Sequence, residues 1–248
     1  ELHQDGQDLE QEKHTNESSI VEQVIQEMFH LQAMHEMEKK QVEQAIENLT
    51  TGVSILPENL VLAELTSQAY FQLAQDQFLA GRYSTVLISL DAAANFNQET
   101  WEQELLRAKA HLQLGKQDYE SSEYENAIKH LEQALPVQAL TGQAAHFLGL
   151  SYYHLQEYEK ALDHFFQCME AAPDTCESYT ITGKILIQQQ RYDEAVQVMN
   201  DFLHIHPDNT DAYYMLGTAL YLSGQFQQAI SAFEQGIEVE PYDHRFYM

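Results

Sequence analysis

Residues 210–243 read TDAYYMLGTALYLSGQFQQAISAFEQGIEVEPYD, and this stretch decides the fold class. Apolar residues recur at helical spacing in both of its halves, first at Tyr213, Leu216 and Leu220, and then at Phe226, Ala229, Ile230, Phe233 and Ile237. The pair Ser223-Gly224 separates the halves as a helix stop, and Pro241 ends the second half because proline cannot continue a helix. The stretch therefore predicts two helices joined by a tight turn.

The same pattern recurs upstream at a constant step of 34 residues. Small and aromatic residues keep this step in four columns: Gly115, Gly149, Gly183 and Gly217; Tyr124, Tyr158, Tyr192 and Phe226; Ala127, Ala161, Ala195 and Ala229; and Pro173, Pro207 and Pro241. Two antiparallel helices approach closely only where a side chain is small, which explains the glycine and alanine columns. The chain is therefore a repeat protein.

A period of 34 residues with these columns resembles the tetratricopeptide repeat, whose pattern is W-x2-L-G-x2-Y, then A-x3-F, then P. The resemblance implies an all-α, right-handed superhelical solenoid of antiparallel helix pairs with about five to six units. Four regular units occupy residues 108–243. Each of them contains the glycine, the aromatic residue, the alanine and the proline of the four columns, except that the first unit lacks the proline.

A further unit precedes them at residues 67–107. It has Ala74 in the glycine column, Gly81 at the turn, Tyr83 in the aromatic column and Val86 in the alanine column. The step from Ala74 to Gly115 is 41 residues, seven more than the period, and seven residues make about two helical turns. We therefore expect that the helix beginning near Thr100 is extended and that the array continues through it.

The two ends of the chain are less regular. Residues 18–66 predict an N-terminal helical pair, either a degenerate repeat at 26–59 with Ala33, Ala45 and Pro57 in the columns, or a simple cap on the stack. Residues 1–17 are polar and aperiodic, which predicts a disordered lead-in. Residues 244–248 would begin the first helix of a further unit, so we expect the chain to continue beyond Met248.

The composition restricts the function classes. The formal net charge is −27 without any basic stripe, so nucleic acid is not expected as a partner. Membrane insertion is not expected either, since no apolar run is long enough. Cys168 and Cys176 are interpreted as reduced residues, which favours a cytoplasmic location, while an extracytoplasmic one stays open because the native N-terminus is missing. The sequence contains no H-E-x-x-H, C-x-x-C or phosphate-loop motif, so we expect no catalysis, metal or cofactor.

The resemblance also implies where a ligand binds, because in this family the first helix of each unit lines a concave groove. Its groove positions here are Phe71, Phe78, Leu112, Tyr119, His146, Leu150, Tyr153, Lys184, Ile187, Tyr214 and Tyr221. The lysine and asparagine clamp that grips carboxylates in chaperone-docking members is absent, since the second positions are Gln68, Lys109, Gln143, Glu177 and Asp211. An apolar, tyrosine-rich wall suits a peptide or a helix, although the same rings could instead pack neighbouring helices.

The sequence therefore predicts a scaffold or adaptor that binds an extended peptide or amphipathic helix of another protein, apolar or basic in character. Two alternatives remain. One is a chaperone for a secreted or aggregation-prone client, and the other is the substrate-recruiting region of a longer enzyme. Association into a homodimer is also left open, because exposed solenoid ends can pair with themselves.

Overall fold

The computed structural model describes residues 2–174 and 176–247, and the regular elements in these ranges are all helical. They are α1 (Leu2–Glu38), α2 (Val42–Ile55), α3 (Leu60–Leu79), α4 (Tyr83–Ala94), α5 (Trp101–Glu120), α6 (Tyr124–Ala134), α7 (Thr141–His154), α8 (Tyr158–Ala171), α9 (Cys176–Gln188), α10 (Tyr192–Ile205), α11 (Thr210–Leu222), α12 (Phe226–Val239) and the 3₁₀ helix η1 (His244–Tyr247). The all-α array of helical repeats that the sequence predicts is confirmed.

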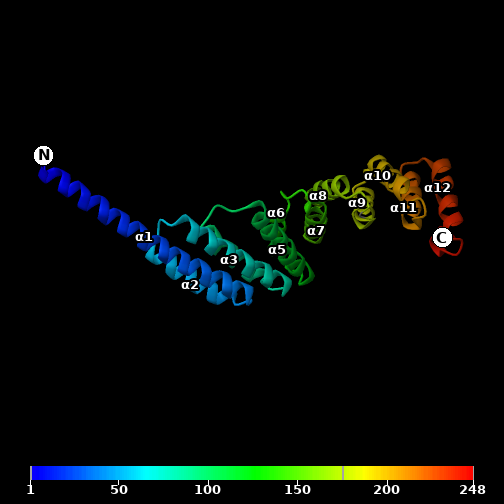
Figure 1. Cartoon of the computed structure of the whole chain (residues 1–248). Helices are drawn as coiled ribbons and strands as arrows, with labels where there is room; N and C mark the ends of the chain where they lie inside the picture. The colour runs from blue at the N-terminus through cyan, green and yellow to red at the C-terminus, as the bar shows by residue number, and fades with distance from the viewer. Residues whose placement is uncertain (1, 175, 248) are drawn as a thin grey trace. The chain divides into compact units, whose positions relative to one another are not determined.

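The chain forms two compact units, residues 1–110 and residues 111–248. The first unit holds the hairpins α1–α2 and α3–α4 and the beginning of α5, and the second holds the rest of α5 with α6 to α12 and η1 (Figure 1). Within each unit, consecutive helices run antiparallel and pack against each other.

The turn inside every hairpin has the same geometry. A residue with positive φ stands at the fifteenth position of each 34-residue unit: Lys40, Gly81, Ser122, Gln156, Gln190 and Gly224. Around each turn the same two backbone hydrogen bonds form; for example, Gln156 N donates to Tyr153 O at 3.0 Å, and Glu157 N donates to Tyr152 O at 2.9 Å. This pairing is the Schellman motif, which satisfies the last carbonyls of the first helix.

The column of small residues meets a column of large residues, which includes the phenylalanine of the A-x3-F pattern. Sixteen residues after each glycine stands a large side chain, at Leu131, Phe165, Met199 and Phe233. An ideal Cβ built on Gly149 lies 2.6 Å from two ring carbons of Phe165, and one on Gly217 lies 2.4 Å from Phe233 Cε1. The glycines therefore let a large side chain of the second helix lie directly on the first helix.

The apolar core differs in size along the chain. In the second unit one continuous cluster of buried residues runs from Leu150 to Ala232. In the first unit, α1, α2 and α3 enclose a cluster around Phe29, Leu49 and Leu62. A smaller cluster lies among α3, α4 and α5, and it consists of Ala74, Val86, Leu90, Leu106 and Ala110.

Two first helices are longer than the family register requires, and their caps explain why. Asn59 accepts a hydrogen bond from Leu62 N at 3.0 Å, so α3 begins at Leu60 rather than near residue 67. Thr100 and Gln103 form a reciprocal capping box, so α5 begins at Trp101. The start of α5 agrees with the extended helix expected near Thr100, whereas the extension of α3 was not anticipated.

Residues 26–59 have the geometry of a repeat. Helix α2 occupies the same unit positions as α8, α10 and α12, and Lys40 adopts the shared left-handed turn. Ala33 and Ala45 are buried at 1% and 0% exposure, as the column residues of the regular units are. These observations favour the degenerate repeat over a simple cap.

The ends differ from the sequence expectation. Helix α1 begins at Leu2, so it covers residues 2–17, for which a disordered lead-in was expected. This segment contains no proline and is rich in Gln, Glu and Leu, which lose little side-chain freedom in a helix. At the other end, residues 244–247 form the short 3₁₀ helix η1 rather than the first turn of an α-helix.

Candidate binding groove

Helices α9 and α11 and the 3₁₀ helix η1 enclose a pocket of about 430 Å³ in the second unit. We name it the C-terminal pocket, and its lining residues are Thr180, Lys184, Ile187, Gln188, Asp211, Tyr214, Met215, Thr218 and Arg245. The first helices of two consecutive repeats supply most of this lining. The predicted groove residues Lys184, Ile187 and Tyr214 therefore come together here.

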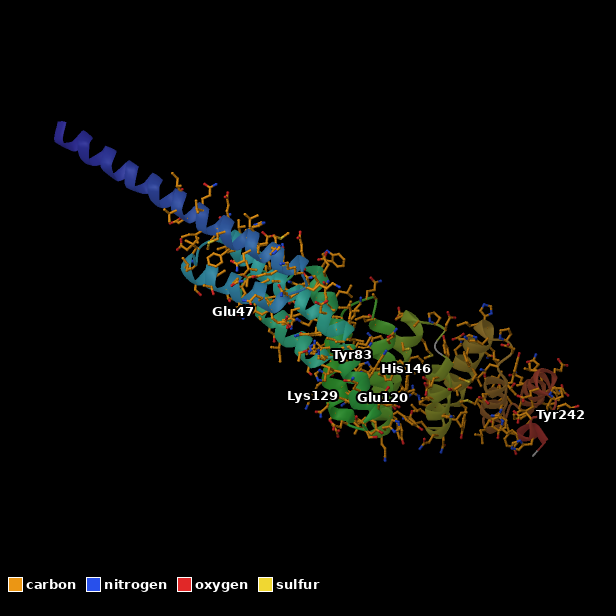
Figure 2. All side chains as sticks on the ribbon, turned by 60° about the horizontal axis from the view of Figure 1, so that its bottom comes forward. Glu47, Tyr83, Glu120, Lys129, His146 and Tyr242 are labelled. Atoms are coloured by element: carbon orange, nitrogen blue, oxygen red, sulfur yellow. The ribbon has the colours of Figure 1, made fainter. Side chains whose placement is uncertain are left out.

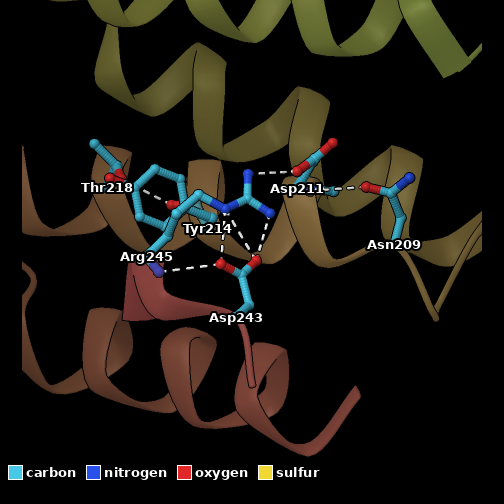
Figure 3. A network of polar contacts seen from close by, with 7 residues as sticks. Asn209, Asp211, Tyr214, Thr218, Asp243 and Arg245 are labelled. Carbon is cyan, nitrogen blue, oxygen red and sulfur yellow. Dashed lines mark hydrogen bonds and ion pairs between the residues drawn. The ribbon is translucent and has the colours of Figure 1, made fainter. Parts of the chain in front are cut away.

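Arg245 lines the C-terminal pocket and is the centre of a network of polar contacts (Figure 3). Its Nε donates to both carboxylate oxygens of Asp243, at 3.0 and 2.9 Å, and its Nη1 donates to Asp211 Oδ1. The guanidinium also lies over the ring of Tyr214, 5.4 Å from the centroid. These contacts hold the pKa of Asp243 below its ordinary value, with the hydrogen bonds from Arg245 as the largest cause.

A second pocket, of about 700 Å³, lies in the first unit. We name it the N-terminal pocket; its lining residues are Met37, Gln68, Phe71, Gln72, Gln75, Asp76, Phe78, Leu79, Leu106 and Lys109. It brings together the predicted residues Phe71 and Phe78 on α3. The aromatic and aliphatic side chains form an apolar floor, while Lys109 and Asp76 add single charges.

His146 connects α7 to α9 by polar contacts. Its Nδ1 lies 2.9 Å from Ser178 Oγ, and its Nε2 lies 3.3 Å from Glu177 Oε2. Burial lowers the pKa of His146 from its ordinary value, although Glu177 acts in the opposite direction. The imidazole, labelled in Figure 2, is 13% exposed, so its polar edge serves the fold more than a ligand.

The aromatic side chains at the twelfth unit position pack inside their own hairpins. Four such rings contact the aromatic ring that starts the second helix of the same hairpin, in the pairs Phe78–Tyr83, Tyr119–Tyr124, Tyr153–Tyr158 and Tyr221–Phe226, with centroids 5.3 to 5.9 Å apart. Tyr119 also contacts Phe147 edge to face and lies 3.3 Å from His154 Nε2 through its hydroxyl. Packing between helices, the alternative considered for these rings, therefore accounts for the position of Tyr119 and Tyr153.

Two predicted groove residues are buried in the core. Leu112 is 2% exposed and Leu150 is 4% exposed. Both follow the helical periodicity of the groove positions, but Leu112 is buried on α5, and Leu150 on α7 belongs to the continuous core of the second unit. The prediction that they contact a ligand is wrong for this reason.

Other residues of the pockets were not predicted. Arg245 was missed because residues 244–248 were expected to begin a further α-helix, and Met215, Leu79 and Leu106 were not among the predicted groove residues. The fixed interval of 34 residues between Asp211 and Arg245 was a signal that could have found Arg245.

Among the residues described, no group of three or more His, Cys, Asp or Glu side chains is placed to hold a metal ion. Within the same part of the chain, none of the helices combines the length and apolar character that crossing a bilayer requires.

The hairpins, the shared turn and the two pockets define the class: an all-α array of helical-hairpin repeats. Residues 186–248 match the family model of the tetratricopeptide repeat, and residues 120–202 match the model of subunit 3 of the anaphase-promoting complex, or cyclosome. The tetratricopeptide-repeat resemblance that the sequence indicates is thus confirmed.

Solved structures show the same fold. YrrB, "a TPR protein with an unusual peptide-binding site", aligns with a TM-score of 0.53 at 19% identity, over 82% of this chain and 97% of its own. MamA AMB-1 aligns with a TM-score of 0.51 at 21% identity, over 71% and 92% of the two chains. MamA from Desulfovibrio magneticus RS-1 gives 0.50 at 19% identity, over 56% and 79%. No curated protein sequence matches the chain.

Proposed function

We propose that this chain is a protein-interaction scaffold without catalytic activity, and that its two pockets receive side chains of an extended peptide or helix of a partner. The observation that carries the proposal is a shared register. Both pockets are lined by the fifth, ninth, twelfth and thirteenth positions of one unit and the second of the next: Phe71, Gln75, Phe78, Leu79 and Lys109 in one, and Thr180, Lys184, Ile187, Gln188 and Asp211 in the other.

The recurrence of these positions in two separate compact units supports a function of the repeat itself. A peptide-binding site is also named for YrrB, whose fold this chain shares.

The linings indicate the chemistry of the partner. The N-terminal pocket combines Phe71, Phe78 and Leu106 in an apolar surface that suits aliphatic or aromatic side chains. The C-terminal pocket presents Tyr214 and Met215 beside the exposed ammonium group of Lys184. Since the whole chain carries a net charge of −27, basic partners are attracted over long range, while the pockets select apolar side chains.

The proposal is tested by selecting peptides from a random displayed library on the full chain and measuring their affinity by fluorescence anisotropy. Phe71→Ala in the N-terminal pocket and Tyr214→Ala in the C-terminal pocket should each weaken the selected peptides by at least about tenfold, because an aromatic anchor typically contributes 2 kcal/mol or more. Tyr242→Ala is the matched control, because Tyr242 is 95% exposed and lines neither pocket (Figure 2).

The outcomes separate the adaptor from the chaperone. A shared motif whose binding depends on one pocket supports the adaptor. Enrichment of apolar peptides without a motif, together with suppression of client aggregation, would favour the chaperone. If neither pocket variant changes affinity, or if Tyr242→Ala weakens it equally, the pockets are not the binding site.

A further inference from the structure

Helix α1 has two apolar faces. One face packs inside the first unit, where Ile25, Phe29, Ala33 and Met37 contact the core around Leu49. The other face is exposed, and we name it the outer stripe: Ile20 (61% exposed), Val21 (57%), Val24 (61%), Met28 (52%), Leu31 (69%) and Met34 (42%). Side chains stand along the side of α1 that faces away from the other helices of the first unit (Figure 2).

The spacing of the outer stripe is that of a helix–helix seam. Val21, Val24, Met28 and Leu31 follow one another at intervals of three, four and three residues, and His35 continues the pattern. Intervals that alternate between three and four keep one line of side chains facing a partner helix, as at the a and d positions of a coiled coil. The helix is already folded against its own core, so pairing requires little additional ordering of the backbone.

The area of the outer stripe is sufficient for a stable contact. Six side chains of this size, each about half exposed, leave roughly 600 Å² of apolar surface, which is at the upper end of the patches that monomers expose. Two such stripes together would remove about 1,200 Å² from water, which reaches the lower limit of specific protein interfaces.

The charges around the outer stripe indicate its occupant. Although the chain carries 39 acidic residues, residues 19–35 contain only Glu22 and Glu27, and they contain no Lys or Arg. A surface for a basic helix would be bordered by carboxylates, and one for an acidic helix by ammonium or guanidinium groups. Glu27 stands on the same side of α1, seven residues from both Ile20 and Met34, and the other polar residues around the stripe are mainly Gln and His. A second copy therefore brings one carboxylate per helix to the seam and no charged border.

We propose that the outer stripe of α1 is a homodimer interface, in which α1 of one copy pairs with α1 of a second copy about a two-fold axis. Such an interface is isologous, which suits a stripe that is complementary to itself. It is distinct from the two pockets, so dimerisation would present two sets of peptide-binding pockets in one assembly. Dimerisation itself does not depend on the proposed peptide binding.

The test is the mass of the full chain in solution, measured by light scattering and by sedimentation equilibrium over a range of concentrations. We expect the wild type to reach about twice its chain mass of 28.6 kDa. The double variant Val24→Glu/Leu31→Glu should be monomeric, with the dissociation constant of the dimer raised by at least about a hundredfold, because it places charges in the seam. The control Ile88→Glu, at a 67% exposed apolar residue on α4, should remain dimeric.

Circular dichroism must show that the variants keep the helicity of the wild type, and because both substituted α1 residues are exposed, we expect that they do. Monomerisation of the seam variant alone supports the proposal. A wild type that stays monomeric up to roughly 100 μM, a seam variant that stays dimeric, or a control that dissociates as fully as the seam variant would overturn it.

Discussion

Gly149→Ala tests whether the close contact between the two helices of a hairpin requires glycine at this column. The added methyl group would lie 2.6 Å from Cδ1 and Cε1 of Phe165 and 3.0 Å from Cγ. Phe165 is completely buried in the core of the second unit, so its ring has no free space into which it can move.

Two opposing effects decide how much Gly149→Ala changes the free energy of unfolding. Replacing glycine by alanine inside a helix stabilises by about 1 kcal/mol. Inserting a methyl group into a packed core costs typically 1–3 kcal/mol, and a fully buried ring places Gly149 in the upper part of that range. We therefore expect Gly149→Ala to lower the free energy of unfolding by about 1–2 kcal/mol.

Gly183→Ala is the matched control. Its new methyl group would meet the terminal methyl groups of Met215 and Met199, at 2.6 and 2.8 Å. Methionine ends are flexible and can move aside, so we expect a change within about 0.5 kcal/mol of zero. Urea unfolding followed by circular dichroism gives both values from the midpoints and slopes.

A compensating variant makes the test stricter. The α3–α4 hairpin has Ala74 and Leu90 at the positions of Gly149 and Phe165, and both are buried. Gly149→Ala/Phe165→Leu copies that pair, so the double variant should be more stable than the sum of the single changes by about 1 kcal/mol or more. The reasoning is refuted if Gly149→Ala stabilises the chain, or if the two changes are simply additive.

The remaining predictions concern the turns and the buried histidines. Gln156→Gly should raise the free energy of unfolding by about 1 kcal/mol, because φ is 63° at this residue and glycine adopts that conformation without strain. Gly224→Ala should lower the free energy of unfolding by about as much, because φ is 81° there, although no atom lies within 4 Å of the new Cβ. Equal effects of both changes in urea unfolding would contradict this backbone explanation. Burial lowers the pKa of His164 and of His146 from the ordinary value of 6.5. The neutral imidazoles therefore contribute to the stability of the folded chain above pH 6.5, and this contribution is lost as the pH falls through the lowered pKa. His164→Gln should therefore reduce the acid sensitivity of the urea midpoint, and an identical pH profile for His164→Gln and the wild type would refute this origin.

The repeat could be predicted from the sequence because its columns are steric requirements. Small residues recur at the positions of Gly149 and Ala161 because the two helices of a hairpin approach closely there, and Pro207 recurs because it ends a helix. The turn was visible only where it contains glycine, at Gly81 and Gly224. Gln156 occupies the same left-handed conformation, but its side chain gives no signal of it, because the motif is fixed by backbone hydrogen bonds.

The candidate site was less predictable. Periodicity places Leu150 and Lys184 at equivalent positions, yet the first is buried and the second lines a pocket, because burial depends on which side chains the next hairpin supplies. The position of Arg245 over Tyr214 depends on a short 3₁₀ helix, and propensity over five residues does not distinguish that from the start of an α-helix.

The small cluster among α3, α4 and α5 implies that the two pockets differ in how they respond to a ligand. Phe71 and Phe78 rest on this cluster, whose five buried members include two alanines and a valine. Segments with few buried apolar contacts open locally at low free energy and exchange their amide hydrogens early. The N-terminal pocket is therefore adaptable, and a ligand there should slow amide exchange in α3 and α4, whereas the C-terminal pocket rests on the large continuous core and is ready-formed before binding.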